Sequence, residues 1–95
     1  MTGRLEGKVA IVTGAGSILQ GWGNGKATAV LFAREGATVI CVDRDLASAE
    51  RAVAIITEEG GRAEALRADI TSAADIDAAV GAAISRHGRI DILQN

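Results

Sequence analysis

Four short runs of apolar residues alternate along the chain with three longer segments of helical character. Residues 8–13 and 37–43 are nearly continuous apolar runs, which are typical of strands buried on both faces. Residues 62–69 alternate small apolar with charged side chains, so they predict a less buried strand. Residues 90–93 start a further apolar run and predict the beginning of a fourth strand.

The segments between these runs carry signals for helix ends. Residues 26–35 have helical composition and stop at Gly36, a candidate C-terminal cap. Asp45 is a candidate N-cap for a second helix, which ends before the glycines at 60 and 61. Ser72 and Asp75 form a capping-box pattern at the start of a third helix, which ends at Gly88. The predicted order is therefore β-α-β-α-β-α-β.

This order predicts one α/β domain. Strands that alternate with helices favour parallel pairing through right-handed crossovers, so we expect a Rossmann-type doubly wound parallel sheet. In that topology the first two helices cover one face of the sheet and the third covers the other. We expect residues 1–95 to be the N-terminal part of a single such domain, truncated after the start of the fourth strand.

Composition and charge exclude several classes of protein. Apolar residues make up 48% of the chain and charged residues 23%, values that exclude disorder. The net charge is −2 and the aromatic share is 2%, so we expect no nucleic-acid partner. One Cys and one His cannot build a disulfide or a four-ligand zinc site, and no apolar run approaches the length of a membrane span. We therefore expect a cytoplasmic protein without a metal or membrane partner.

A glycine-rich loop lies between the first strand and the first helix. Glycines at this place let the backbone approach a diphosphate, whose charge is favoured by the free N–H groups at the helix N-terminus. Asp43 ends the next strand, close to the interval of about 20 residues at which an acidic residue binds the ribose of a dinucleotide. The alternative is that the glycines form only a tight turn and that Asp43 is a polar strand end or a cap.

The motifs resemble those of the classical short-chain dehydrogenases/reductases. The segments TGAGS at residues 13–17 and GNGKA at 23–27 are similar to the family's T-G-x-x-x-G-x-G fingerprint. ADIT at residues 68–71 resembles the end of the family's third strand, where the Asp side chain and the next backbone group face the adenine ring. Asn95 resembles the first Asn of the N-N-A-G motif. The resemblance implies an oxidoreductase that transfers hydride between a nicotinamide and a carbonyl or alcohol substrate, with homo-oligomers possible.

The candidate site residues follow from the loop and the resemblance together. We assign none of them a catalytic or metal-binding role. The candidate cofactor-binding residues are Gly14, Gly16, Ser17, Gly23, Asn24, Gly25, Asp43, Arg44, Asp69, Ile70 and Asn95.

The cofactor is predicted to be NAD rather than NADP. The Asp43 carboxylate can accept hydrogen bonds from the ribose hydroxyls but would repel a 2′-phosphate. Arg44 directly follows Asp43 and favours a phosphate instead, although Ser17 and Trp22 of the loop supply no second positive charge.

Two departures from the family pattern affect function. Residues 18–22 form an insertion in the glycine loop, and Trp22 either covers the cofactor or packs the loop onto its own helix. The family's catalytic Ser and Tyr-x-x-x-Lys belong to later segments, and this sequence contains no Tyr. We therefore expect these 95 residues to be inactive alone, as part of a longer enzyme or a truncated remnant. A non-catalytic dinucleotide-binding module and an S-adenosylmethionine-dependent transferase are the other interpretations.

The remaining reactive side chains predict structural roles. Cys41 lies within a buried strand without a basic neighbour in sequence, which predicts an inert core thiol. His87 lies in the last turn of the third helix, where a positively charged side chain interacts favourably with the helix dipole. We therefore expect it to have no catalytic role.

Overall fold

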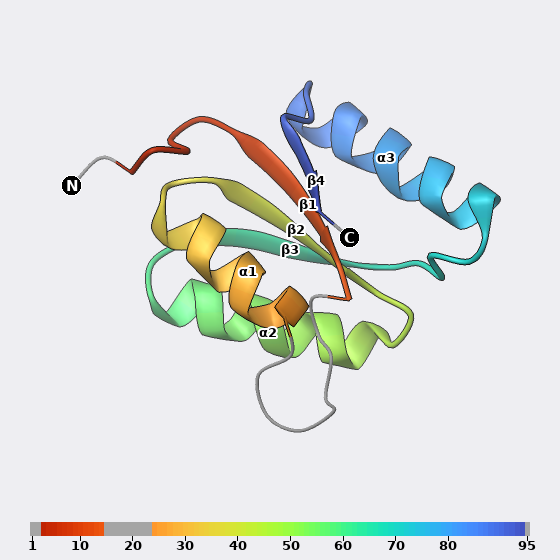
Figure 1. The fold of residues 1–95 in the computed structure, drawn as a ribbon, viewed down its shortest axis with the longest axis horizontal. Helices are drawn as coiled ribbons and strands as arrows, with labels where there is room; N and C mark the ends of the chain where they lie inside the picture. Colours follow the sequence, from red (N-terminus) through yellow and green to blue (C-terminus); the bar gives the residue numbers. More distant parts are fainter. Residues whose placement is uncertain (1–2, 15–23, 95) are drawn as a thin grey trace.

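The computed structural model describes residues 3–14 and 24–94. These residues form strands and helices in the predicted alternating order (Figure 1). The strands are β1 (Val9–Thr13), β2 (Thr38–Asp43), β3 (Arg62–Arg67) and β4 (Ile92–Gln94), and the helices are α1 (Asn24–Arg34), α2 (Leu46–Glu58) and α3 (Ala73–His87).

All four strands pair in parallel within one sheet, in the order β3-β2-β1-β4. Ile11 of β1 pairs with Ile40 of β2 on one side and with Leu93 of β4 on the other. The chain proceeds from β1 through β2 to β3 and then returns across β1 to add β4. This arrangement confirms the predicted Rossmann-type doubly wound parallel sheet.

Two apolar layers cover the two faces of the sheet. On one face, Val39 of β2 is fully buried against Ala49 and Ile56 of α2 and the inner side of α1. On the other face, Ile40 is buried in a second layer to which α3 contributes Ala83. α1 and α2 lie side by side and α3 lies apart from them, as predicted (Figure 1).

The helix ends use the caps that the sequence predicts. The Asp45 carboxylate accepts a hydrogen bond from the N–H of Ala47 at the start of α2. The Ser72 hydroxyl accepts one from the N–H of Asp75 at the start of α3. Gly88 ends α3 with a φ of 78°, a left-handed conformation that favours glycine, and its N–H donates to the Ile84 carbonyl.

Two strand boundaries lie two residues from the predicted positions, because carboxylates take over backbone hydrogen bonds. β3 ends at Arg67 rather than at Asp69, since the Asp69 N–H donates to the Asp75 carboxylate. β4 begins at Ile92 rather than at Ile90, since the Val9 N–H of the neighbouring strand donates to the Asp91 carboxylate at 2.9 Å. β4 lies at the edge of the sheet, where Leu93 is 53% exposed.

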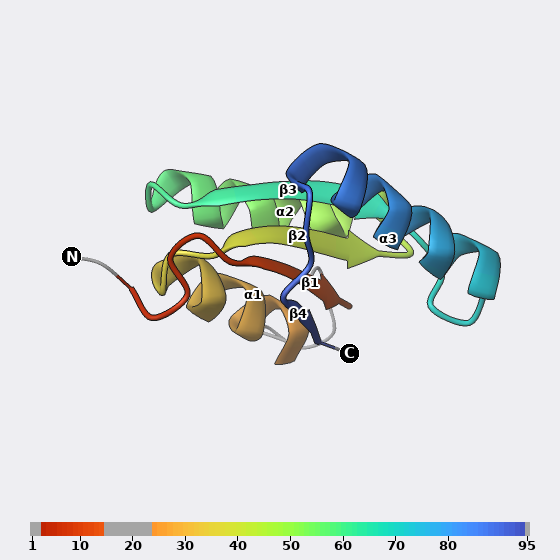
Figure 2. The same cartoon turned by 90° about the horizontal axis from the view of Figure 1, so that it is seen from above.

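The helix α3 extends past the carboxyl ends of the strands. Figure 2 shows its N-terminal turn projecting beyond the end of β2. The loop from β3 to α3 therefore lies at the same end of the sheet as the segments that follow β1 and β2.

Candidate functional site

A cleft of about 300 Å³ lies at the carboxyl ends of the strands. Its walls come from the residue after β1, the end of β2 and the loop after β3. In open α/β sheets, ligands bind outside the carboxyl ends of the strands, where the strand order reverses. The lining residues are Gly14, Asp43, Arg44, Ala68, Asp69, Ile70 and Thr71.

Gly14 forms the wall of the cleft next to β1. Its φ is 67°, in the left-handed region that L side chains rarely adopt. A Cβ added to Gly14 would meet no described atom within 4 Å. Glycine is therefore favoured here by the backbone conformation and not by a lack of room for a side chain. The chain can therefore turn sharply out of β1 at the cleft.

Asp43 ends β2 and brings a carboxylate to the cleft. Its Oδ1 accepts a hydrogen bond from the Asp45 N–H at 2.9 Å, which ties the side chain to the start of α2. A carboxylate has lone pairs on both oxygens, so this bond leaves the acceptor capacity that a pair of ligand hydroxyls needs.

Asp69 brings a second carboxylate from the loop after β3. Its Oδ1 accepts hydrogen bonds from the Thr71 hydroxyl at 2.6 Å and from the Thr71 N–H at 2.9 Å. These bonds, with the positive charges of Arg44 and Arg67, hold the pKa of the Asp69 carboxyl below its usual value. The group is therefore ionised at neutral pH and acts as an acceptor.

Ile70 adds an apolar surface between these polar groups. Ile70 lines the cleft and is 51% exposed, so its aliphatic side chain is accessible to a ligand.

Asp75 supports the loop after β3, a role that the capping-box pattern did not predict. In a capping box the carboxylate returns to the N–H of the cap residue. Here the Ser72 N–H donates to the Asp69 carbonyl, and Asp75 Oδ2 accepts from the Asp69 N–H at 2.9 Å. Asp75 thus holds the backbone of Asp69, which lines the cleft, instead of accepting a hydrogen bond from the Ser72 N–H.

Arg67 is a second cation near the cleft, and sequence reasoning did not single it out. Its Cα is the register partner of Asp43 on the neighbouring strand. Both Arg44 and Arg67 act on the Asp69 carboxylate. Positive charge at this end of the sheet is therefore not confined to Arg44, and adjacency in the sheet rather than in sequence brings the second cation close.

The structure brings five predicted residues into one cleft, namely Gly14, Asp43, Arg44, Asp69 and Ile70. Asn24 and Gly25 open α1, the helix that the glycine loop leads into. The remaining predicted residues Gly16, Ser17, Gly23 and Asn95 lie outside the described residues, as does the insertion at 18–22.

Cys41 and His87 lie away from the cleft. Cys41 is fully buried in β2, and burial raises the pKa of its thiol to about 12. The Nε2 of His87 lies 3.2 Å from Oε1 of Glu64 on β3, so His87 joins α3 to the sheet. Both findings agree with structural roles.

A larger hollow of about 430 Å³ lies at the opposite, amino end of the strands. Its charged side chains form ion pairs with one another, Arg34 with Glu59 at 2.7 Å and Arg62 with Glu6 at 3.2 Å. Because these charges neutralise one another, the hollow is a weaker candidate for binding a charged ligand than the smaller cleft.

Within the described ranges, no group of His, Cys, Asp and Glu side chains could hold a metal ion. None of the described helices is long and apolar enough to cross a membrane.

Comparisons with known proteins agree with the geometry. The sequence matches the family model of the short chain dehydrogenases over residues 8–95. It is 45% identical over 92 residues to the 7alpha-hydroxysteroid dehydrogenase of Escherichia coli (strain K12), covering 97% of this chain and 34% of that protein. The chain thus spans about a third of the length of this curated relative.

Two solved structures with bound cofactors share the fold. The 3-ketoacyl-(acyl-carrier-protein) reductase from Brucella melitensis, complexed with NADH, matches with a TM-score of 0.79 and 52% identity over 94% of this chain and 33% of its own. A metagenomic short-chain oxidoreductase in complex with NADP matches with a TM-score of 0.84 and 34% identity over 94% of this chain and 38% of its own. The match over residues 8–95 and these likenesses show that the chain belongs to the short-chain dehydrogenase family.

Proposed function

We propose that the chain is the N-terminal, dinucleotide-binding part of an NAD(P)-dependent oxidoreductase. The complete enzyme would transfer hydride between the nicotinamide and a carbonyl or alcohol group of a small molecule. The observation that carries this proposal is the cleft in which Gly14, the Asp43 and Asp69 carboxylates and Ile70 meet at the carboxyl ends of the strands.

The residues of the cleft fit the adenosine half of a dinucleotide. Asp43 would accept hydrogen bonds from the ribose hydroxyls. Asp69 and Ile70 would face the adenine ring, the carboxylate at its polar edge and the aliphatic side chain against its plane. The volume of about 300 Å³ is at the lower end for a small-molecule site, which suits one half of the cofactor.

The diphosphate would lie between Gly14 and the start of α1. The helix begins at Asn24, and the N-terminal end of a helix favours negative charge through its dipole. Gly25 in the first turn carries no side chain, so it would let the diphosphate approach the backbone. When bound, the cofactor supplies the hydride acceptor or donor, and these residues hold it in place.

NAD is the proposed cofactor, with NADP second. The relatives include one structure with NADH and one with NADP, so membership of the family is compatible with both. In this chain, Asp43 at the end of β2 would meet a 2′-phosphate with like charge, and two charges 4 Å apart repel by roughly 4 kcal/mol at an effective dielectric of 20. Arg44 partly offsets that repulsion.

Proton transfer would be supplied by residues other than these 95. The family resemblance assigns it to a Tyr assisted by a Lys, and this sequence has no Tyr. A non-catalytic dinucleotide-binding module is the second candidate, because the residues that line the cleft have cofactor-binding roles in the proposal. A cytoplasmic location also stays a prediction.

Equilibrium titration of the full-length protein with NADH and NADPH tests the proposal. We expect saturable enhancement of nicotinamide fluorescence with a lower Kd for NADH, and NADH formation from NAD with at least one member of a panel of secondary alcohols. Binding without turnover across the panel would favour the non-catalytic module. No binding of either dinucleotide would contradict both candidates.

A further inference from the structure

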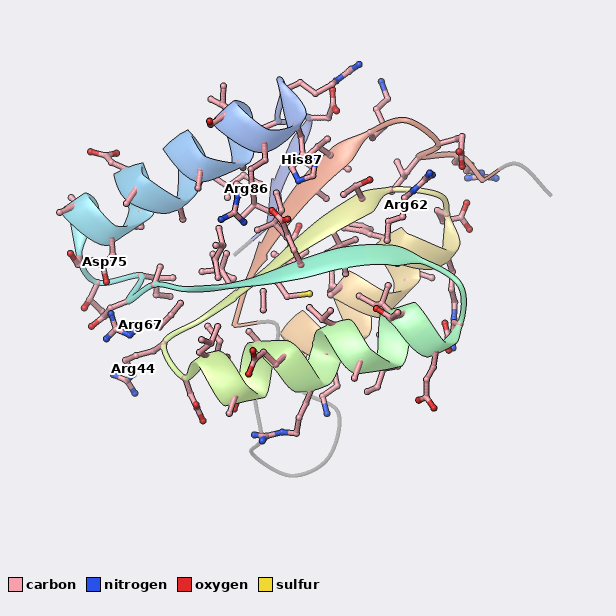
Figure 3. All side chains as sticks on the ribbon, turned by 180° about the vertical axis from the view of Figure 1, so that it is seen from behind. Arg44, Arg62, Arg67, Asp75, Arg86 and His87 are labelled. Atoms are coloured by element: carbon pink, nitrogen blue, oxygen red, sulfur yellow. The ribbon has the colours of Figure 1, made fainter. Side chains whose placement is uncertain are left out.

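The ion pair between Arg67 and Asp75 lies beside the cleft, outside the residues proposed to bind the cofactor. Arg67 ends β3, and its Cα is in register with that of Asp43. Neighbouring strands of a sheet lie about 4.8 Å apart, so Arg67 starts next to the carboxylate that would bind the ribose. Figure 3 shows Arg44, Arg67 and Asp75 together at one end of the sheet, with Arg62 at the other end of β3.

Asp75 pairs with the Arg67 side chain outside the lining of the cleft. Arg67 Nη1 lies 3.5 Å from Asp75 Oδ2, and the two residues line a separate hollow of about 170 Å³ against α3. Arg67 is not among the residues that line the cleft, whereas Arg44 is. The ion pair therefore removes one of two neighbouring guanidinium groups from the position of the ribose.

Asp75 itself is held firmly. Its Oδ2 also accepts the Asp69 N–H at 2.9 Å, and its own N–H donates to the Ser72 hydroxyl at 3.2 Å. Arg67 is the mobile partner, because its side chain is 57% exposed and exposed ion pairs constrain long side chains weakly. Loss of the Asp75 charge would free Arg67 to turn toward the cleft.

We propose that Asp75 determines cofactor specificity by neutralising Arg67. With the pair intact, Asp43 faces the ribose with only Arg44 to offset its charge, and a 2′-phosphate is disfavoured. Without the Asp75 charge, Arg44 and Arg67 together attract a 2′-phosphate despite Asp43. Asp75 is thus a positioning residue that acts through Arg67, and this inference rests on the proposed function.

The test substitution is Asp75→Asn in the full-length protein. Asparagine keeps an oxygen that can accept the Asp69 N–H, so mainly the charge is lost. Titration with NADH and with NADPH gives two Kd values for each variant. We expect the ratio of the NADPH Kd to the NADH Kd to fall by about fivefold in Asp75→Asn, and by less in high salt, as for other interactions between exposed charges.

Two further variants separate this role from a purely structural one. Asp77→Asn removes a charge from an exposed position on the same helix and should leave the ratio of Kd values unchanged. Adding Arg67→Gln to Asp75→Asn should restore the parental ratio, because the freed guanidinium is then absent.

Three results would overturn the inference. One is an Asp75→Asn variant that binds NADH and NADPH with the parental ratio, or weakens both equally. Another is a lowered ratio that persists when Arg67→Gln is added. In both of these cases NADH still binds and the proposed function stands. The third is a parent protein that binds neither dinucleotide, which would overturn the proposed function and this inference together.

Discussion

The carboxylate of Asp91 accepts a hydrogen bond from the Val9 N–H at 2.9 Å, and the Asp91 N–H donates to the Val9 carbonyl at 2.8 Å. Arg89 holds the other carboxylate oxygen, with Nη2 2.6 Å from Oδ1. Val9 begins β1 and Asp91 directly precedes β4. This pair therefore sets the register of the edge strand against the central strand, and with it the position of Thr13 and Gln94 at the cleft end.

The Asp91 contact should make stability depend on pH. The hydrogen bonds from Arg89 and from the Val9 N–H lower the pKa of the Asp91 carboxyl in the folded state. A lowered folded-state pKa stabilises the fold above the unfolded-state pKa, and this contribution is lost as the pH falls through the folded value. Urea unfolding of the full-length parent and of Asp91→Asn should therefore show a more stable parent at pH 7, and the difference should shrink progressively as the pH falls below about 4. A difference that stays constant with pH would contradict this account.

Gly81 is a position at which alanine should stabilise the protein. It lies inside α3, and an added Cβ would meet no described atom within 4 Å. Gly81→Ala should raise the free energy of unfolding by about 0.5–1 kcal/mol, because alanine favours a helix interior. Gly88→Ala is the matched control, since the space there is also open but φ is 78°. It should destabilise, and equal effects of the two changes would be inconsistent with the assigned backbone conformations.

Gly25→Val should weaken cofactor binding far more than it weakens the fold. The valine side chain would stand in the first turn of α1, in the space proposed for the diphosphate. We expect the NADH Kd of the full-length protein to rise on the order of tenfold, with only a small change in Tm. Gly81→Val introduces the same side chain in another helix and should leave the Kd unchanged. Unaltered NADH titration of Gly25→Val would refute the placement of the diphosphate.

Residues 1–95 alone should be marginally folded at best and should show no dehydrogenase turnover. β4 is an edge strand with only three residues, and the exposed side chains of Leu93 and Ile84 lie on it and on α3. Exposed apolar groups at a sheet edge promote association. Thermal unfolding and a dehydrogenase assay on the purified 95-residue chain provide the measurement. A sharp, concentration-independent transition together with NADH formation would be evidence against both parts of this prediction.

The sheet and its helices could be predicted because their signals are local. The continuous apolar runs predict β1 and β2. Asp45, Ser72 and Gly88 mark helix ends because each cap depends on hydrogen bonds and backbone angles within a few residues. Asp43 and Asp69 each end a predicted strand, and the carboxyl ends of parallel strands meet at one edge of a sheet, so both could be placed at that edge.

The supporting contacts around the cleft could not be predicted in the same way. Arg67 is near Asp43 only because β3 pairs with β2 in a particular register. Asp75 matched a local capping pattern, but its carboxylate bonds to the backbone of Asp69 instead. In both cases tertiary contacts determine which residue Arg67 or Asp75 meets, and the spacing of residues along the chain does not predict such contacts.

Hydrogen exchange of the full-length protein, followed by mass spectrometry with and without saturating NADH, tests the location of the dinucleotide site most directly. We predict that NADH slows exchange in peptides covering residues 43–47 and 69–75, which line and support the cleft. Peptides covering residues 59–62, at the hollow on the opposite end of the sheet, should exchange at the same rate in both samples. Protection confined to residues 59–62, or no protection at residues 43–47 and 69–75 while NADH is bound, would contradict the proposed site.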